Sequence, residues 1–356
     1  MNPVVTVVVP AYNARETIAH TLASIQAQDL REIEIRVVDD GSHDDTREIV
    51  AGLAGADPRI VLITQPNGGV ARARNTGLAE ANGRFSAFCD ADDIWHPEKL
   101  TRQVASLEAA PGAGLSYAWH RRIDPEDRLL AASATPRIEG SVLHRHLEWN
   151  FISNGSTVLV PTPLARETGF EPALHEAGNQ GCEDYLFQLL IARNHRFVCV
   201  PAFLVGYRIG NSSMSHGVDR MIRSHLQTFA IIEAYDPNDG SIKRIIARRR
   251  TKLLVELFRN RIRRRDLSAA TGALIGALRN GPLRVPGFIL DEVKTGMSRY
   301  SDIPVRKSSS EAQTGRHFAE FGAEESDGAW ATKRSARYLA ALGELDARRA
   351  TVVGSV

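Results

Sequence analysis

Short apolar runs alternate with longer segments of mixed polarity along the first half of the chain. The apolar runs are rich in β-branched residues, as is typical of strands buried on both faces. The longer segments carry apolar residues at helical spacing or open with acidic residues, which favours helices. The predicted strands are 4–9, 33–38, 60–64 and 84–88, and the predicted helices are 15–28, 70–81 and one that opens at 44–46. Strands that alternate with helices indicate an α/β fold with a mostly parallel sheet flanked by helices.

The pattern is less regular beyond Pro111. Strands are expected at 114–118, 156–160 and 203–205, and a polar hairpin or insertion is expected at 121–135. The α/β region therefore continues into the second half of the chain with less even spacing.

The composition changes at Val218. Residues 220–235 are amphipathic, and residues 243–265 hold eleven basic residues and one acidic residue, with apolar residues at near-helical spacing. These features predict a basic helical unit. We therefore divide the chain into an α/β domain at 1–217, a basic helical extension at 218–300, and a tail at 301–356 that is partly helical or flexible.

Overall composition argues against several classes of protein. The 356 residues carry a net charge of +2, which gives no attraction to nucleic acid. Three cysteines without C-x-x-C spacing argue against a disulfide framework or a zinc site and suit a reducing compartment. No window approaches about 18 uninterrupted apolar residues, and no basic segment followed by a long apolar run opens the chain. We therefore expect no spanning helix, no signal peptide and a cytoplasmic location.

Three carboxylates leave the end of the buried strand predicted at 84–88. Asp90 and Asp92 are two residues apart, so on an extended chain they lie on the same side. Their hard oxygen atoms suit Mg²⁺ or Mn²⁺, which take one or two carboxylates together with substrate phosphates. The alternative is an acidic loop between a strand and a helix. For Asp93 we adopt that alternative, as a cap of a helix that has Pro97 in its first turn.

Four loops follow the predicted strands and should meet at the carboxyl edge of the sheet, where ligands bind in such folds. These loops are 10–13, 39–42, 67–74 and 90–93. Tyr12 offers a ring for stacking, the glycines at 68–69 allow close backbone approach, and Arg72 and Arg74 offer cations. Each feature also has a structural interpretation, as a packing residue, a turn or a solvated helix residue. Neither a G-x-G-x-x-G loop nor a P-loop is present, which argues against dinucleotide-binding folds and P-loop NTPases.

Four motifs in these loops occur in a fixed order. They are Val9-Pro10-Ala11-Tyr12-Asn13, Val37-Val38-Asp39-Asp40-Gly41-Ser42, Gly68-Gly69 with Ala73-Arg74-Asn75-Thr76-Gly77, and Asp90-Ala91-Asp92-Asp93. Over about residues 3–215 the chain resembles the nucleotide-sugar-binding half of a family 2 glycosyltransferase with the Rossmann-like GT-A fold. That resemblance makes residues 1–217 the catalytic domain.

The resemblance implies roles for the loop residues in binding a nucleotide-sugar. The implied binding residues are Pro10, Ala11, Tyr12, Asp39, Asn67, Gly68, Arg72 and Asp90. Asp39 would bind the nucleobase, usually uracil, and Asp90 would contact the ribose. Arg72, with Arg74 as the alternative, would approach the base or the phosphates. Asp92 and Asp90 would ligate Mn²⁺ or Mg²⁺ on the diphosphate.

The acceptor side is predicted from two later segments. Glu183 and Asp184 open a helix, where acids are stabilised by the helix dipole and can simply cap it. The resemblance implies instead that Asp184 is the general base, and Glu183 would orient the acceptor or the base. A Tyr-Arg strand followed by a Ser-Met-Ser loop resembles the end of the family's catalytic domain. His216, next to that loop, has three interpretations: a further metal ligand, a contact to the diphosphate, or an exposed residue without a role in the site.

The resemblance implies an inverting, metal-dependent transferase that moves a sugar from a UDP-sugar to a hydroxyl of a glycan or a lipid-linked acceptor. Such an enzyme serves cell-surface polysaccharide or glycolipid synthesis. One alternative is a sugar-1-phosphate nucleotidyltransferase, but residues 10–13 lack its glycine-rich loop. Another is a degenerate transferase kept for carbohydrate binding, against which the intact carboxylates argue.

The basic unit at 243–265 has two interpretations. It could lie on the anionic inner leaflet of a membrane, in peripheral contact with the lipid that carries the acceptor. Alternatively, it is a helical lid that packs on the catalytic domain with a solvated basic face. Of the two we favour the packed lid.

Overall fold

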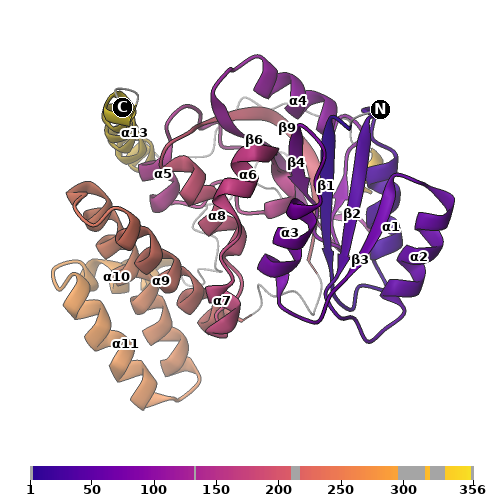
Figure 1. Ribbon diagram of the computed structural model, residues 1–356. Coiled ribbons are helices and arrows are strands. Elements are labelled where there is room, and N and C mark those ends of the chain that lie inside the picture. Colours follow the sequence, from indigo (N-terminus) through magenta and orange to yellow (C-terminus); the bar gives the residue numbers. More distant parts are fainter. Residues whose placement is uncertain (1–2, 132–133, 210–216, 296–316, 321–332, 354–356) are drawn as a thin grey trace.

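A computed structural model of the chain shows one mixed sheet flanked by helices, with further helices at the C-terminal end (Figure 1). The structure describes residues 3–131, 134–209, 217–295, 317–320 and 333–353. The predicted α/β class with a C-terminal helical extension is confirmed.

The first half of the chain forms the parallel part of the sheet. Its elements are β1 (Val5–Ala11), α1 (Ile18–Gln26), β2 (Ile33–Asp39), α2 (Thr46–Ala56), β3 (Ile60–Thr64), α3 (Val70–Ala79) and β4 (Phe85–Phe88). β1 pairs in parallel with β2 and β4, and β2 pairs in parallel with β3. All four strands and all three helices predicted for this half are confirmed, with ends that differ by a few residues.

Residues of β1 alternate between two cores, which explains why all of them except Thr6 are apolar. Val5, Val7 and Val9 join a core with α1 and α4 on one face of the sheet, whereas Val8 joins a second core with α3 and α8 on the other face. Because neighbouring strand residues point to opposite faces, a strand covered on both faces needs apolar residues on both of them.

The second half of the chain extends the sheet with strands in both directions. Its strands are β5 (Ile94–Trp95), β6 (Ala113–Ile123), β7 (Leu129–Ala131), β8 (Val158–Pro161) and β9 (Arg196–Arg208). The sheet order is β3-β2-β1-β4-β8-β6-β9-β5, and β7 pairs with β6 as a hairpin. The helices of this half are α4 (Lys99–Glu108), α5 (Leu143–Glu148), α6 (Thr162–Thr168), α7 (Ala173–Glu176) and α8 (Glu183–Ala192), with a 3₁₀ turn, η1, at Gly155–Thr157.

The predicted cap at Asp93 is wrong. Asp93 is followed by the short strand β5, which pairs antiparallel with β9, and α4 begins only at Lys99 with Pro97 outside it. β5 is two residues long, so its pairing with a strand more than 100 residues later in the chain decides its conformation. That pairing leaves no signal in the local sequence.

The helices beyond residue 217 pack beside α5 and α8 (Figure 1). They are α9 (Val218–Tyr235), α10 (Gly240–Arg263), α11 (Leu267–Asn280) and α12 (Val285–Thr295). Ile242, Ile245 and Ile246 of α10 are buried in the same core as Leu143 and Leu147 of α5. The apolar face of α10 is thus covered by protein, as the favoured packed interpretation predicts.

The last helix, α13 (Lys333–Val353), docks back onto α5. Asp346 is buried and accepts hydrogen bonds from the His144 backbone N–H and from Arg145 Nε at 2.7 Å. Arg349 forms ion pairs with Asp236 and Asp239, which lie between α9 and α10. Within the described ranges, no helix is both long enough and apolar enough to cross a bilayer.

Candidate functional site

Hydrogen bonds join the predicted loops at the carboxyl edge of the parallel strands. The Asp40 carboxylate accepts hydrogen bonds from the backbone N–H groups of Gly68 at 2.9 Å and Gly69 at 2.8 Å. The Asn13 N–H donates to Ser42 Oγ at 3.0 Å. These contacts confirm that loops 10–13, 39–42 and 67–74 meet, and a hydrogen bond from Arg74 to Asp90 joins loop 90–93 to them.

Two glycines are required where these loops approach one another. Gly41 has φ +75°, and a Cβ there would lie 2.9 Å from the backbone N of Asn67. Gly69 has φ +84°, and its Cβ would lie 2.5 Å from the ring of His175. Any larger residue would combine an unfavourable left-handed backbone with a steric clash, which explains the glycines in both motifs.

The residues assigned to the nucleobase lie at the ends of β1 and β2. Pro10 and Ala11 are buried in β1, and Tyr12 follows with 49% of its surface exposed, so its ring is available for stacking. Asp39 is buried and accepts hydrogen bonds from Arg47 Nε and Nη2 at 3.1 and 2.9 Å. The Asn67 side chain donates to the Asp40 carbonyl. The binding roles of these residues remain predictions.

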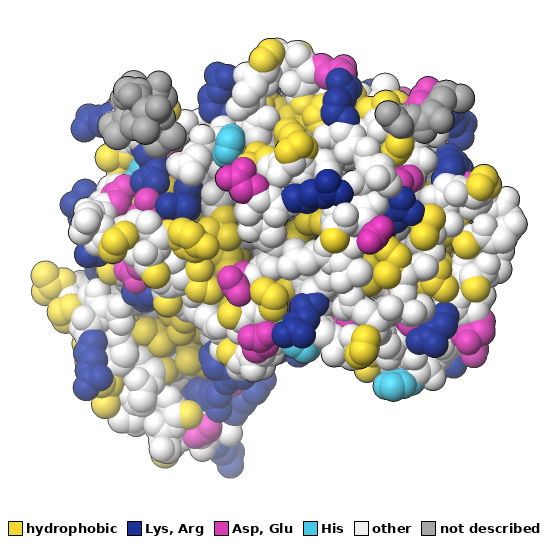
Figure 2. All heavy atoms as spheres, in the orientation of Figure 1, with side chains coloured by type: hydrophobic (Ala, Val, Ile, Leu, Met, Phe, Trp, Pro, Cys, Tyr) yellow, Lys and Arg dark blue, Asp and Glu magenta, His cyan; other side chains and the backbone are white. Residues whose placement is uncertain are grey.

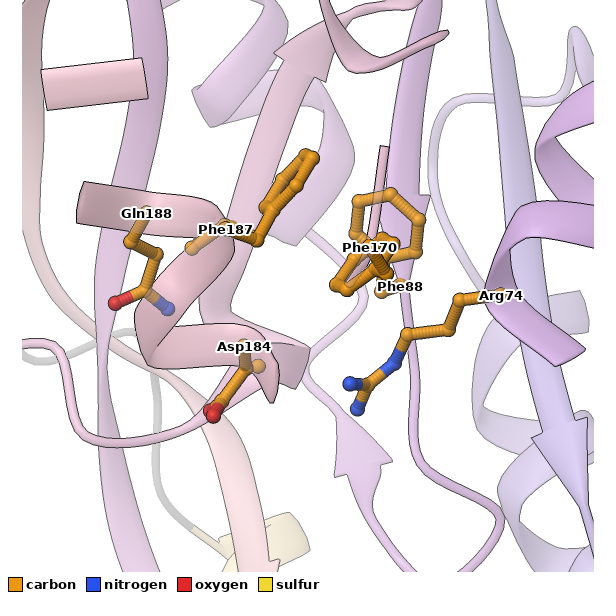
Figure 3. A pocket seen from close by; sticks show the side chains of 8 residues that line it. Arg74, Phe88, Phe170, Asp184, Phe187 and Gln188 are labelled. Atoms are coloured by element: carbon orange, nitrogen blue, oxygen red, sulfur yellow. The ribbon is translucent and has the colours of Figure 1, made fainter. Parts of the chain in front are cut away.

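Arg74 lies between the acidic loop and the start of α8, and Figure 3 shows its guanidinium beside Asp184. Its Nη2 donates to Asp90 Oδ1 at 2.6 Å, and its guanidinium lies 5.1 Å from the centre of the Phe170 ring. Gly155 lies between the two charged groups, since a Cβ on it would be 3.2 Å from both Arg74 Nη2 and Asp184 Cβ. Arg74 is almost fully buried, so its charge acts on both carboxylates with little screening by solvent.

Arg72 lies elsewhere, on the surface. It is more than half exposed and forms an ion pair with Glu176 of α7 at 2.7 Å. Of the two arginines weighed from the sequence, Arg74 thus contacts the acidic loop, and Arg72 does not. The assignment of Arg72 to the donor remains a prediction.

Asp184 lies in the first turn of α8 beside a small recess (Figure 3). The recess is too narrow to hold a water molecule, and its lining residues are Arg74, Phe88, Gly155, Val158, Phe170, Asp184, Phe187 and Gln188. Phe170 and Phe187 stack with ring centres 4.2 Å apart and form its apolar wall. The recess therefore marks where Asp184 and Arg74 face the same apolar wall, and it is not itself a cavity for a ligand.

Burial changes the acidity of both carboxyls that open α8. It raises the pKa of Asp184 to about 6, and Asp90 and Glu183 act in the same direction while Arg74 opposes them. Burial also raises the pKa of Glu183, whose Oε2 accepts a hydrogen bond from the Gly181 N–H. A carboxylate with a pKa near 6 is ionised at neutral pH yet is a better proton acceptor than an ordinary aspartate, as a general base requires.

Asp90 and Asp92 offer two carboxylates for a cation. Burial and the Asp90 charge raise the pKa of Asp92 to about 6, while Arg208 acts in the opposite direction. Within the described ranges, no three His, Cys, Asp or Glu side chains gather as a metal site. The pair still fits Mg²⁺ or Mn²⁺, since these ions take one or two carboxylates and complete their shell with substrate phosphates and water. His216, the third predicted ligand, lies outside the described residues.

A buried network behind the acidic loop was missed by the sequence analysis. Asp93 Oδ2 accepts hydrogen bonds from Ser156 Oγ at 2.5 Å and Asn154 Nδ2 at 3.0 Å, and its Oδ1 accepts one from the Arg208 N–H. Ser156 Oγ in turn accepts from the Asp90 N–H. Asp93 thus anchors the loop and does not cap a helix. The one signal in the sequence was a third acid, next to Asp92, in a loop that leads into a buried segment.

Arg208 holds the other side of the same loop. Its Nε donates to the Asp92 carbonyl at 2.8 Å, and its Nη1 donates to the carbonyls of Asp124 and Pro125 in the β6–β7 turn. Its Nη2 forms an ion pair with Asp127 at 2.5 Å. The arginine of the Tyr-Arg strand therefore fixes the backbone that carries Asp92.

Comparisons with known proteins point to the same family as the sequence motifs. The sequence model described as glycosyl transferase family 2 matches residues 6–163. The chain is 31% identical over 214 residues to UDP-Glc:alpha-D-GlcNAc-diphosphoundecaprenol beta-1,3-glucosyltransferase WfgD of Escherichia coli, a match that covers 59% of this chain and 79% of WfgD. The match covers a smaller share of another curated relative: the chain spans 31% of glycosyltransferase GlyA of Streptococcus pneumoniae, to which it is 29% identical over 59% of its own length.

Solved structures share the fold. S. aureus TarS 1–349 in complex with UDP-GlcNAc aligns with a TM-score of 0.60 at 20% identity, over 85% of this chain and 94% of TarS 1–349. At this level of identity the likeness establishes the fold and leaves the ligands open.

Proposed function

Because this chain belongs to glycosyltransferase family 2, we propose that it moves a sugar from a nucleoside-diphospho-sugar, a UDP-sugar, to an acceptor hydroxyl with inversion at the anomeric carbon. The observation that carries this proposal is the line of charged groups Asp90, Arg74 and Asp184 at the carboxyl edge of the sheet. Through Arg74, the loop that carries Asp90, which suits a metal-bound diphosphate, lies next to the carboxylate of Asp184, which suits an incoming hydroxyl.

The donor end would be held by the first four loops. Tyr12 would stack on the base, Asp39 would accept its N–H, and the backbone at 67–69 would allow the phosphates to approach. Asp90 and Asp92 would hold Mn²⁺ or Mg²⁺, which supplies positive charge to the leaving diphosphate. The TarS complex contains UDP-GlcNAc, and a mannosyltransferase of the same fold from Pyrobaculum calidifontis was solved with GDP-Man and Mn²⁺.

The acceptor end would depend on Asp184. Its carboxylate would take the proton of the attacking hydroxyl as that oxygen bonds to the anomeric carbon and the bond to the diphosphate oxygen breaks. Attack opposite the leaving group inverts the configuration, so no covalent enzyme intermediate is needed. Arg74 would keep Asp184 ionised, and Glu183, buried behind it, would orient it.

The acceptor class is proposed from the relatives. WfgD is named for a GlcNAc carried on diphosphoundecaprenol, and a teichuronic acid glycosyltransferase of Bacillus subtilis matches at 43% identity over 103 residues. A lipid-diphosphate-linked or growing glycan, used in polysaccharide synthesis, is therefore the proposed acceptor of this chain. For such an acceptor we propose a location on the cytoplasmic side of the membrane.

Nucleoside diphosphate release tests the proposal directly. With Mn²⁺ and a lipid-diphosphate-linked GlcNAc acceptor, we expect a panel of UDP-sugars and GDP-Man to include a UDP-sugar from which UDP is released. A matched reaction with UTP and a sugar 1-phosphate should release no pyrophosphate, because a nucleotidyltransferase would act there. Donor binding without release for every acceptor offered would instead indicate a carbohydrate-binding protein and would contradict the proposal.

Replacing Arg74 and Arg72 by methionine, in two separate variants, tests which of the two arginines acts on Asp184. Arg74→Met removes the cation that lowers the pKa of Asp184, so this pKa should rise above about 6 and the acid limb of the pH–rate profile should shift to higher pH. The matched variant Arg72→Met removes an exposed ion pair with Glu176 and should leave the acid limb unchanged. Equal shifts in both variants would show that the interaction with Asp184 is not specific to Arg74.

A further inference from the structure

Helix α11 buries three alanines, and of its four large apolar residues only Leu274 packs against the neighbouring helices while the other three are exposed. Ala270, Ala273 and Ala277 are buried against the neighbouring helices. On another face, Leu267 is 66% exposed, and Ile275 and Leu278 are each exposed by more than 40%. A helix that serves only a soluble fold places its large apolar residues in the core, so this arrangement points to a partner on the outer face.

The exposed apolar surface continues beyond α11. Leu283, in the turn between α11 and α12, is 96% exposed, and Ile289 and Leu290 of α12 are exposed as well. Seven of the twelve large hydrophobic side chains that are exposed among the described residues lie within 262–290. Single exposed hydrophobic residues are ordinary, but a concentration within one short stretch marks an interaction surface. We call residues 262–290 the α11 surface.

Basic side chains accompany these apolar ones. The exposed arginines of this surface are Arg263, Arg264, Arg265, Arg279 and Arg284. The one acidic residue in the range is Asp266, which caps α11 through the Ala269 N–H and pairs with Arg261. Figure 2 shows dark blue side chains next to yellow apolar ones at the lower left, over the helices labelled α9, α10 and α11 in Figure 1. The surface therefore combines positive charge with bulky apolar groups.

We propose that the α11 surface docks on an anionic lipid bilayer, with Leu283 and the α11 leucines entering the interface and the arginines facing lipid phosphates. Exposed leucines beside arginines match the two layers of such an interface, which are acyl chain and charged headgroup. A second copy of the chain fits this surface less well, because a twofold interface would bring the five arginines of one copy against the same five arginines of the other, and their charges would repel. α10 spans most of the segment for which the sequence analysis weighed membrane contact and favoured packing, and it is covered by α5, α9, α11 and α12.

The inference deepens the proposed function, since a lipid-linked acceptor is reached only at a bilayer. Vesicle binding, however, is measured without turnover. If vesicles bind but no donor is consumed, the proposed function fails alone. If UDP is released from a donor but no vesicles bind, the surface inference fails alone.

Co-sedimentation of the full chain with vesicles tests the inference. We expect binding to vesicles of phosphatidylglycerol and phosphatidylcholine that weakens as salt rises, and at least tenfold weaker binding to phosphatidylcholine alone. Leu283→Ser should weaken binding about tenfold, and Arg263→Ser/Arg279→Ser/Arg284→Ser should abolish the preference for anionic lipid. Both variants should melt at the parent's temperature, because the altered side chains are exposed.

The matched control is Arg128→Ser/Leu130→Ser, which removes an exposed arginine and a 45% exposed leucine from the β6–β7 hairpin. It should bind vesicles as the parent does. Loss of binding in this control equal to that in the α11 variants would overturn the inference. Failure of the parent to bind anionic vesicles would also overturn the inference. This includes the case in which the parent forms dimers in sedimentation velocity and Leu283→Ser abolishes them, because the surface would then bind a second copy of the chain.

Discussion

Asp184→Asn should lower turnover about 10²- to 10⁴-fold, the contribution usual for a general base, while the affinity for nucleoside diphosphate stays nearly unchanged. The amide keeps the shape of the side chain and its place in the first turn of α8 but cannot accept a proton from the acceptor hydroxyl. Nucleoside diphosphate release under saturating donor measures the loss, and calorimetric titration with UDP and Mn²⁺ measures the affinity.

The same variant carries a stability signature with a defined sign. Burial raises the pKa of Asp184 to about 6 in the folded state, so keeping the group ionised costs folding free energy above that pH. The cost is absent below the unfolded value of about 4. Asp184→Asn should therefore melt at a higher temperature than the parent above pH 6, and the difference should vanish as the pH falls to about 4.

The control for Asp184 is another aspartate at the start of a helix. Asp45 precedes α2, is exposed, and makes no capping hydrogen bond through its side chain. Asp45→Asn should change neither turnover nor melting temperature appreciably. Turnover of Asp184→Asn within a few-fold of the parent would remove Asp184 from the role of base, whatever the melting curves show.

Asp92→Ala should abolish the metal-dependent part of donor binding. In the parent, UDP with Mn²⁺ should raise the melting temperature by several degrees, since a ligand at 100 times its Kd stabilises by about 2.7 kcal/mol. The variant should show only the shift that UDP gives without metal. Thermal melts across a Mn²⁺ titration at fixed UDP provide the measurement.

Asp29→Ala serves as the control for Asp92, because Asp29 is an exposed carboxylate remote in sequence from the acidic loop. It should keep the full metal-dependent shift. Metal-dependent stabilisation of Asp92→Ala equal to that of the parent would show that the cation, if needed, is held by other groups. Since Arg208 and the Asp93 network fix the loop backbone, removal of the Asp92 side chain alone should leave the fold intact.

The two arginines of α3 show where local sequence stops being informative. Arg72 and Arg74 are two residues apart on a helix and so point about 200° apart. Either could have faced the site. Arg74 faces it because α3 packs with Ala71 and Leu78 in the core shared with Phe88 and Phe170. Arg72 is thereby directed towards Glu176 on the surface.

Asp93 and the α11 surface depended on tertiary structure in a similar way. Asp93 is held by residues more than 60 positions later in the chain, and no periodicity near it indicates that pairing. For α11, apolar residues at helical spacing give the same sequence pattern whether the neighbouring helices bury them or leave them exposed. Only the packing of Ala270, Ala273 and Ala277 inward showed which face was left uncovered.

The sequence by itself determined the alternation of buried strands and helices up to β4, the meeting of the four loops at one edge of the sheet, and the position of Asp184 at the start of a helix. It could do so because burial on both faces imposes apolar runs, and parallel crossovers bring the strand ends to one edge. Tertiary structure alone decided the partners of Asp93, the arginine beside Asp90, and the outward face of α11. Those depend on contacts between segments far apart in the chain, which local patterns do not encode.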